Sequence, residues 1–475
     1  MPAVTESAAP AASSATVRRP WRLLTCLILA VVAGLGLGHF ALTGDRTPDT
    51  ALDAAARPGV DATKASGTEA AIAKLQAQLR ELPDEPRLLT RLGLAHLARA
   101  RETADPTQYA RAEEALARAN RLAPGDAGTL TGLGALALAR HDFGEALTLA
   151  GKALDAAPEA NDALAVLADA EVELGRYDAA TATVQALVDR KPALASLSRV
   201  SYLRELHGDH DGAVATMEQA ATAGTDSPAE RAAVRTLLGD LHLAAADLPR
   251  AEAAYTTALR EAGGPHPPAE IGLARVAAAR GDLAAAAARL RDVTARRPEA
   301  ASVALLGDVE AALGNRAEAA RQYGLVRAIE ALNRANGVAV DLELARFEAD
   351  HARDPAGDPA GAVALARMAA RARPTVFGED TLGWALRQAG KPAEALPHAR
   401  AATRLGTLDA LLWYHRAAIE ADLGRGADAR EHLATAFRLN PRLTVRDLPA
   451  ATRLAERLGL RLAGRRGAQI PGGTR

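Results

Sequence analysis

Cysteine and aromatic residues are scarce in this chain of 475 residues. The single cysteine, Cys26, excludes an intramolecular disulfide and leaves no thiol nucleophile anywhere else. Aromatic residues make up only 3% of the chain, whereas hydrophobic residues make up 49%, with alanine prominent among them. Because strands favour β-branched and aromatic side chains and alanine is the best helix former, this composition predicts an all-α protein.

An excess of charge of either sign is also missing. The chain has 57 basic and 58 acidic residues, which gives a formal net charge of -1. Nucleic acids and anionic lipids are attracted by a strongly basic field, and this balance supplies none. We therefore expect no nucleic-acid partner.

Catalytic and metal-binding motifs are absent as well. The sequence contains no phosphate-binding loop, no H-E-x-x-H zinc motif, no G-x-S-x-G nucleophile elbow and no C-x-x-C pair. The cluster most similar to a metal site, from His207 to Asp211, falls at a predicted turn, where polar residues are ordinary. The sequence thus predicts a protein that is not an enzyme and holds no cofactor or metal.

One long hydrophobic run does occur, over residues 23–43. At 1.5 Å per residue, its length matches the hydrocarbon core of a bilayer, about 30 Å thick. Basic residues from Arg18 to Arg22 precede it, and acidic residues from Asp45 to Asp53 follow it. The positive-inside rule therefore predicts a single-pass transmembrane helix with a cytoplasmic N-terminus and the remaining chain outside the cytoplasm.

Three other interpretations of this N-terminal region fit less well. Residues 41–43 match a signal-peptide cleavage site poorly, so a cleaved, secreted form is disfavoured. Residues 23–26 resemble a lipoprotein box, but Cys26 begins the apolar run instead of ending it. Arg18 and Arg19 resemble part of a twin-arginine signal. Residues 34–38 contain one G-x-x-x-G pattern, which favours a weak homo-oligomer.

The segments beside the apolar run and at the C-terminus are rich in small and polar residues. Segments of this kind bury too little apolar surface to offset the entropy of ordering. We expect a disordered cytoplasmic tail over residues 1–22, a flexible linker over 44–67 and a disordered tail over 464–475.

From residue 86 onward the sequence repeats itself. Predicted turns recur at Gly175, Gly208, Gly281, Gly314, Gly390 and Gly424, with neighbouring turns 33 or 34 residues apart and longer gaps that fit two units. An alanine follows each turn at a fixed place, namely Ala146, Ala180, Ala213, Ala251, Ala286, Ala319, Ala362, Ala395 and Ala429. Small residues let two helices cross closely, turn glycines suit a left-handed backbone, and Asp209, Asp282 and Asn315 are candidate caps of the next helix.

This pattern resembles the tetratricopeptide repeat family, whose unit of 34 residues is a pair of antiparallel helices. In the last unit, Trp413, Gly424, Ala429, Leu433 and Pro441 occupy the family's first-helix Trp, turn, crossing Ala, large apolar and terminal Pro positions. The resemblance implies an α-α superhelix of about ten helix pairs over residues 86–441. Capping helices are expected over 68–85 and 442–463, and residues 101–108 form an insertion between the first two helices of the array.

The resemblance also implies a function, because family members hold peptides with residues of successive first helices on the concave face. The residues at matching positions are Asp162, Asp169, Arg199, Tyr202, Thr236, Asp240, Arg275, Asp308, Asp380, Trp384, Arg387 and Tyr414. Packing inside a unit is the competing interpretation for Tyr202 and Trp384. The leading hypothesis is a membrane-anchored scaffold that binds an extended or helical segment of an envelope or secreted protein. The alternatives are an accessory subunit or substrate-docking module of a cell-envelope enzyme or assembly machinery, and an assembly factor that oligomerises.

Overall fold

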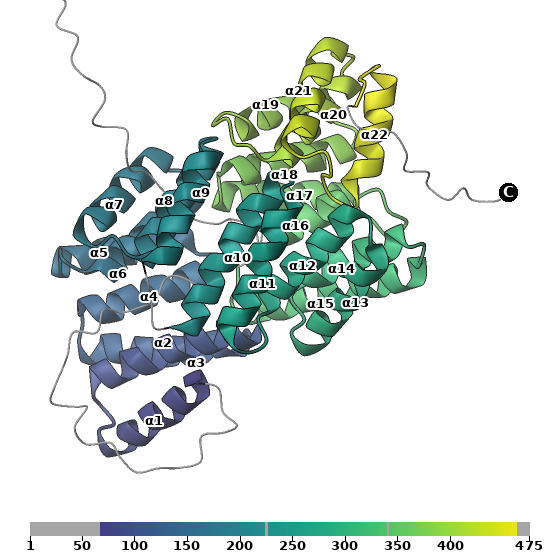
Figure 1. Ribbon diagram of the computed structural model, residues 1–475. Helices are drawn as coiled ribbons and strands as arrows, with labels where there is room; N and C mark the ends of the chain where they lie inside the picture. Colours follow the sequence, from purple (N-terminus) through teal and green to yellow (C-terminus); the bar gives the residue numbers. More distant parts are fainter. Residues whose placement is uncertain (1–66, 224–226, 340–341, 463–475) are drawn as a thin grey trace, which may run out of the picture.

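A computed structural model of the chain describes residues 67–462 apart from 224–226 and 340–341. This part of the chain contains 22 α-helices and no strand (Figure 1). Ten antiparallel helix pairs, α2/α3 to α20/α21, follow one another between the single helices α1 and α22. The prediction of an all-α superhelix of about ten helix pairs is confirmed for the described residues.

The helices alternate between first and second members of a pair. The two end helices are α1 (Gly67–Glu81) and α22 (Asp447–Arg457). The first helices are α2 (Pro86–Thr103), α4 (Ala127–Ala139), α6 (Asn161–Glu173), α8 (Leu194–Leu206), α10 (Pro228–Ala244), α12 (Pro267–Arg280), α14 (Ala300–Ala312), α16 (Leu342–Asp350), α18 (Val376–Gln388) and α20 (Ala410–Asp422). The second helices are α3 (Thr107–Leu122), α5 (Phe143–Ala156), α7 (Tyr177–Arg190), α9 (His210–Thr222), α11 (Leu248–Ala262), α13 (Leu283–Arg296), α15 (Arg316–Ala335), α17 (Pro359–Ala372), α19 (Pro392–Ala402) and α21 (Gly426–Leu439).

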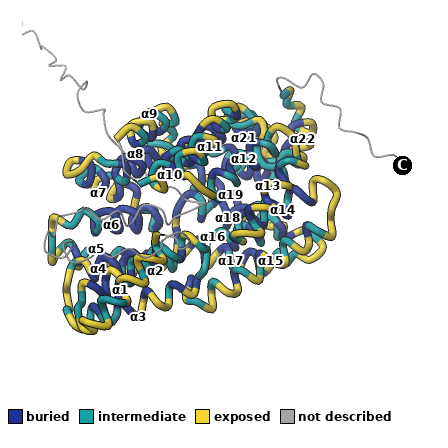
Figure 2. Tube along the Cα trace, turned by 60° about the horizontal axis from the view of Figure 1, so that its bottom comes forward, coloured by how far each residue is buried: buried dark blue, intermediate teal, exposed yellow. Residues whose placement is uncertain are grey.

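Small residues set the spacing within and between the pairs. All nine predicted crossing alanines are buried, and none has more than 3% of its surface exposed. Gly239 on α10 and Gly272 on α12 enclose the ring of Tyr255, so that a Cβ on either glycine would lie within 2.5 Å of it. Figure 2 shows the result, a buried seam that follows the array while the outer turns are exposed. These alanines therefore lie where two helices cross, and their small side chains allow the close approach.

Most of the turns within the helix pairs have a left-handed residue, as the sequence predicts, and some also have a capping aspartate. Gly208 has a φ of 77°, in the left-handed region where glycine is favoured, and His141 occupies the same position with a φ of 61°. Asp209 and Asp282 cap the following helix by accepting a hydrogen bond from a backbone N–H three residues on. The predicted cap at Asn315 is wrong, since its side chain makes no cap hydrogen bond and instead donates to Glu310.

Two units depart from the regular pattern. Of the predicted insertion at residues 101–108, residues 101–103 lengthen α2 to 18 residues and residues 107–108 begin α3, so only residues 104–106 connect the two helices. The helix stops at Ala104, which has a φ of 54°. Further on, α15 has 20 residues whereas α16 has only nine. The long gap between the turns at Gly314 and Gly390 arises there.

The array turns tightly enough to contact itself. Hydrogen bonds join residues nearly 200 positions apart: Ala339 N to Arg140 O at 2.9 Å, Arg373 Nε to Glu173 Oε2 at 2.7 Å, Val376 N to the Tyr177 hydroxyl at 3.0 Å, and the Thr407 hydroxyl to Leu206 O at 2.6 Å. In each case the end of a helix or the loop after it contacts the connection between two helix pairs that lie about six units later in the sequence. As a result, α16–α19 lie beside α6–α9 (Figure 1). The superhelix thus completes one turn in about six units of 34 residues and then packs on itself.

The predicted N-terminal tail, transmembrane helix and C-terminal tail lie outside the described residues, and so does the predicted linker except for Gly67, which begins α1. Among the helices that the structure describes, none is both long enough and apolar enough to cross a membrane.

Candidate functional site

The twelve predicted groove residues all lie on first helices, as expected, and none of them is fully exposed. Seven are buried: Asp169, Arg199, Tyr202, Thr236, Asp380, Trp384 and Tyr414. The other five keep partial contact with solvent: Asp162, Asp240, Arg275, Asp308 and Arg387. The predicted positions are therefore brought onto one side of the array, but most of their side chains contact the protein itself.

Many of these side chains bind one another from one unit to the next. The Arg199 guanidinium on α8 donates two hydrogen bonds to the Asp169 carboxylate on α6, with 2.8 Å between Nε and Oδ1. Arg275 on α12 donates to Asp240 on α10 at 3.0 Å, and the Tyr255 hydroxyl donates to the same oxygen at 2.7 Å. Such pairs, about one repeat apart in sequence, tie successive first helices together, because a buried charge is tolerated only when it is paired.

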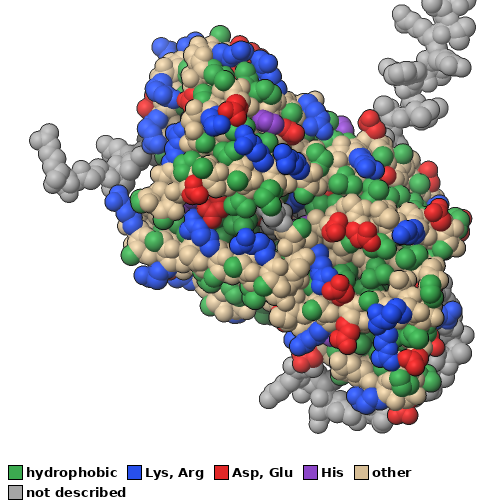
Figure 3. Space-filling view, turned by 180° about the vertical axis from the view of Figure 1, so that it is seen from behind, with side chains coloured by type: hydrophobic (Ala, Val, Ile, Leu, Met, Phe, Trp, Pro, Cys, Tyr) green, Lys and Arg blue, Asp and Glu red, His purple; other side chains and the backbone are tan. Residues whose placement is uncertain are grey.

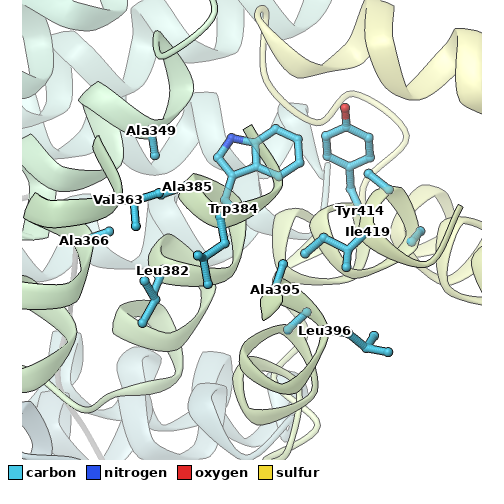
Figure 4. Packing of buried hydrophobic residues seen from close by; sticks show 14 of the residues in the cluster. Ala349, Val363, Ala366, Leu382, Trp384, Ala385, Ala395, Leu396, Tyr414 and Ile419 are labelled. Atoms are coloured by element: carbon cyan, nitrogen blue, oxygen red, sulfur yellow. The ribbon is translucent and has the colours of Figure 1, made fainter. Parts of the chain in front are cut away.

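Trp384 and Tyr414 belong to the largest apolar cluster (Figure 4). The Trp384 ring stacks on His415 with 3.9 Å between ring centroids, and the Arg387 guanidinium lies 4.8 Å from the Trp384 centroid. Asp380 accepts a hydrogen bond from His415 Nδ1 at 2.9 Å. Despite its burial, His415 has a raised pKa, because the Asp380 charge and hydrogen bond favour the imidazolium form. Packing therefore accounts for Trp384, although a ligand contact stays a prediction.

The remaining predicted residues also have neighbours within the array. Thr236 shares a hydrogen bond of 3.0 Å with His266 Nε2. Asp308 accepts a hydrogen bond from the Tyr323 hydroxyl at 2.8 Å and lies 3.8 Å from Arg446. The prediction that these residues contact a ligand is not tested by these contacts.

Several carboxylates lie close together on this side, and the sequence singled out only two of them, Asp240 and Asp380. We call Glu205, Asp240, Asp350, Asp380, Asp409 and Asp447 the inner acidic cluster; they come from α8, α10, α16, α18, the turn before α20, and α22. Burial raises the pKa of Glu205 to about 8, and the charges of Asp409 and Asp240 add to the effect. Burial likewise raises the pKa of Asp350 to about 6, with a contribution from Asp447.

Besides Arg275 at Asp240 and His415 at Asp380, two arginines partly balance the inner acidic cluster. Arg346 on α16 lies 3.9 Å from Asp350 and also senses the charges of Asp409, Asp380 and Asp447. Arg446 binds Asp354 at 3.2 Å. Among the described residues, Glu205, Asp409 and Asp447 are the members of this cluster that form no ion pair. Burial raises the pKa of Glu205 and Asp409, so a positively charged ligand group beside them would favour their ionised forms.

One sequence signal could have revealed part of this cluster. Asp169, Glu205 and Asp240 are separated by 36 and 35 residues, close to one repeat, so an acidic position recurs along the first helices. No motif could have revealed Asp409, because it approaches Glu205 only when the superhelix closes on itself. On the face seen in Figure 3, which lies behind that of Figure 1, basic and acidic side chains are interspersed.

Comparisons with known proteins agree with the helix pairs. Two sequence profiles, both described as tetratricopeptide repeat, match residues 137–204, and residues 204–267 and 381–442. A comparison with curated protein sequences found no match.

Solved structures similar to the chain have low sequence identity to it. The APC/C heterotetramer Cut9–Hcn1 is 14% identical, with 82% of this chain and 95% of that chain covered and a TM-score of 0.38. A tetratricopeptide repeat protein from Parabacteroides merdae is 19% identical, with 51% and 98% covered and a TM-score of 0.38. Yeast Tom70 is 13% identical, with 78% and 96% covered and a TM-score of 0.34.

Proposed function

Because the chain belongs to the tetratricopeptide repeat family, a group of interaction scaffolds that are generally non-catalytic, we propose that it binds a segment of another protein on its concave side. The observation that carries this proposal is the inner acidic cluster, which gathers carboxylates from six parts of the array. A protein segment with Lys or Arg side chains fits this surface, since opposite charges attract and each desolvated carboxylate gains a partner.

The residues that keep contact with solvent define where such a segment can lie. Asp240, Arg275 and Asp308 line successive first helices and are partly exposed, as are Arg346 and Asp354 further along. An extended segment crosses one first helix after another, so it can meet these side chains in turn. The buried Arg199–Asp169 pair instead serves to hold the first helices in place.

We further propose that residues 23–43 anchor the protein in the cell membrane and that the array is presented on the extracytoplasmic side. The support comes from the length of the apolar run and the arginines before it. The partner is then an envelope or secreted protein. A reporter enzyme fused after Arg475 tests this topology, since activity only in the cytoplasm would contradict it.

The groove proposal is tested with the full-length chain and a synthetic arginine-rich peptide. Asp350→Asn combined with Asp354→Asn removes one carboxylate of the inner acidic cluster and one that binds Arg446 beside it, and it conserves side-chain volume. The matched control is Asp84→Asn combined with Asp292→Asn, at side chains that are 70% and 73% exposed on the outside.

We expect the inner double variant to weaken peptide binding about tenfold or more at low salt, and the control to leave it unchanged. Equal weakening in both variants would show that the peptide responds only to overall charge. A failure of the wild-type chain to bind the peptide at all would remove the proposal that the groove takes a cationic segment.

A further inference from the structure

The helix α15 differs from every other second helix of the array. It has 20 residues, whereas the other second helices have between 11 and 16. Its exposed residues are mostly apolar and follow a helical spacing: Ala317, Ala320, Gly324, Leu325, Ala328, Ala331, Leu332 and Ala335, which we call the α15 outer face. Leu325 and Leu332, one heptad apart, are 41% and 51% exposed. On α21, by contrast, Asp428, Arg430, Glu431 and Arg438 are exposed.

The opposite side of α15 holds the helix firmly in the array. Val326 is buried with Leu344 and Phe347 of α16. Tyr323 fills the space beside Gly307 on α14, where a Cβ would approach its ring within 2.4 Å. The α15 outer face is therefore a preformed surface, and a partner that binds it does not pay to order the helix.

Charges at the edge of this face restrict the partner. Arg316, Arg321 and Arg334 are exposed beside the apolar residues, and the carboxylate among them, Glu318, already binds Arg321 and Gln322. Within the part of the chain that the structure describes, Arg316 and Arg334 form no ion pair. The rim is thus cationic, and it complements Asp or Glu side chains.

We propose that the α15 outer face binds an amphipathic α-helix of another protein, with an apolar stripe of Ala and Leu and acidic residues on its flanks. Ala and Gly positions let a second helix approach to about 8–10 Å between axes, which is the spacing of packed helices. Leu325 and Leu332 then fit between the side chains of the partner helix, as pairs one heptad apart do in coiled coils. This surface is independent of the concave groove, so the array carries two binding sites.

Two other occupants fit the face less well. In an antiparallel pair of two copies, opposite ends of α15 meet, so Arg316 of one copy would approach Arg334 of the other and repel it. A lipid surface is disfavoured because membrane affinity rises with buried apolar area, and alanine and glycine offer little of it.

The test uses the full-length chain and a synthetic 21-residue helical peptide with an Ala/Leu stripe and Glu flanks. A second peptide carries Lys flanks in place of Glu. The variant Leu325→Glu combined with Leu332→Glu alters the α15 outer face, while Met368→Glu, at an equally exposed apolar residue of α17, is the control. Because all three side chains lie on the surface, the variants are expected to fold, and circular dichroism verifies this.

We expect the Glu-flanked peptide to bind, the Lys-flanked peptide to bind at least about tenfold more weakly, and the double variant to lose about tenfold or more in affinity. Met368→Glu should leave binding unchanged. Equal binding of both peptides, or no effect of the double variant, overturns the proposal. Two further results would overturn it if the peptide does not bind. One is binding of phosphatidylglycerol vesicles that the double variant abolishes, and the other is a concentration-dependent dimer in sedimentation that the double variant abolishes.

Discussion

Arg373 offers the most direct measure of what holds the two superhelical turns together. Its side chain is 1% exposed and lies between Glu173, which is 2% exposed, and Glu343. Nε donates to Glu173 Oε2 at 2.7 Å, and Nη1 donates to both Glu343 oxygens at 3.2 Å. The guanidinium also lies 5.4 Å from the Phe143 ring centroid, so one cation joins α5, α6 and α16.

The substitution Arg373→Met keeps most of the side-chain volume and removes the charge. Glu173 then stays buried without its cation, and removal of one partner of a buried ion pair costs about 3–5 kcal/mol. Replacing Glu173 with Met as well removes the stranded carboxylate. The double variant should therefore be more stable than Arg373→Met alone. Glu343 does not need replacing, because its side chain is 30% exposed and can turn toward water.

The loss caused by Arg373→Met should also depend on pH. Burial raises the pKa of Glu173 even with Arg373 beside it, and it rises further once the guanidinium is gone. A carboxyl whose pKa is higher in the folded than in the unfolded chain stabilises the fold only while it is protonated, and this contribution is lost as the pH rises. The loss should therefore be greater at pH 8 than at pH 5.

Guanidinium denaturation followed by circular dichroism measures these differences. The control is Arg367→Met, which breaks an ion pair to Glu394 whose side chains are 48% and 51% exposed, and which should cost less than about 1 kcal/mol. The reasoning is refuted if Arg373→Met costs no more than Arg367→Met, or if the double variant is less stable than Arg373→Met alone.

Two further predictions concern close packing and the contact between turns. Gly239→Ala places a Cβ 2.5 Å from the fully buried Tyr255 ring and should destabilise the fold by about 1–3 kcal/mol. Gly151→Ala has no atom within 4 Å of the new Cβ and should stabilise the fold by up to about 1 kcal/mol. Thermal unfolding measures both changes. Tyr177→Phe removes the acceptor of the Val376 N–H, 3.0 Å away, and should cost about 1–3 kcal/mol and speed hydrogen exchange at Val376; unchanged exchange would contradict it.

The repeat could be predicted from the sequence because its determinants are local. Crossing alanines, turn glycines and capping aspartates act within about one unit, so each unit reports its own helix pair. The exceptions are local too. Asn315 resembles a cap by type, but its side chain finds a better partner in Glu310, which is fully buried.

The position of the candidate site on the first helices was predictable, whereas its chemistry was not. Arg199 and Asp169 are predicted ligand contacts because they lie at the family's positions, and the sequence did not reveal that they also bind each other. Whether a polar side chain binds its neighbour or a ligand depends on distances of a few ångströms between helices. These distances cannot be derived from the spacing of residues in the sequence.

The closure of the superhelix links the inner surface to the stability of the whole array. Glu205 and Asp409 sense each other's charge although they lie about 200 residues apart, because their turns meet where Thr407 binds Leu206 O at 2.6 Å. A cationic segment bound between them interacts with both superhelical turns, so it is held best when the turns are closed. By linkage, the ligand then stabilises the closed form to the extent that it prefers that form. If the groove binds a cationic segment as proposed, substitutions that loosen the contact between the superhelical turns at Arg373 should weaken that binding, although Arg373 itself is not one of the groove residues.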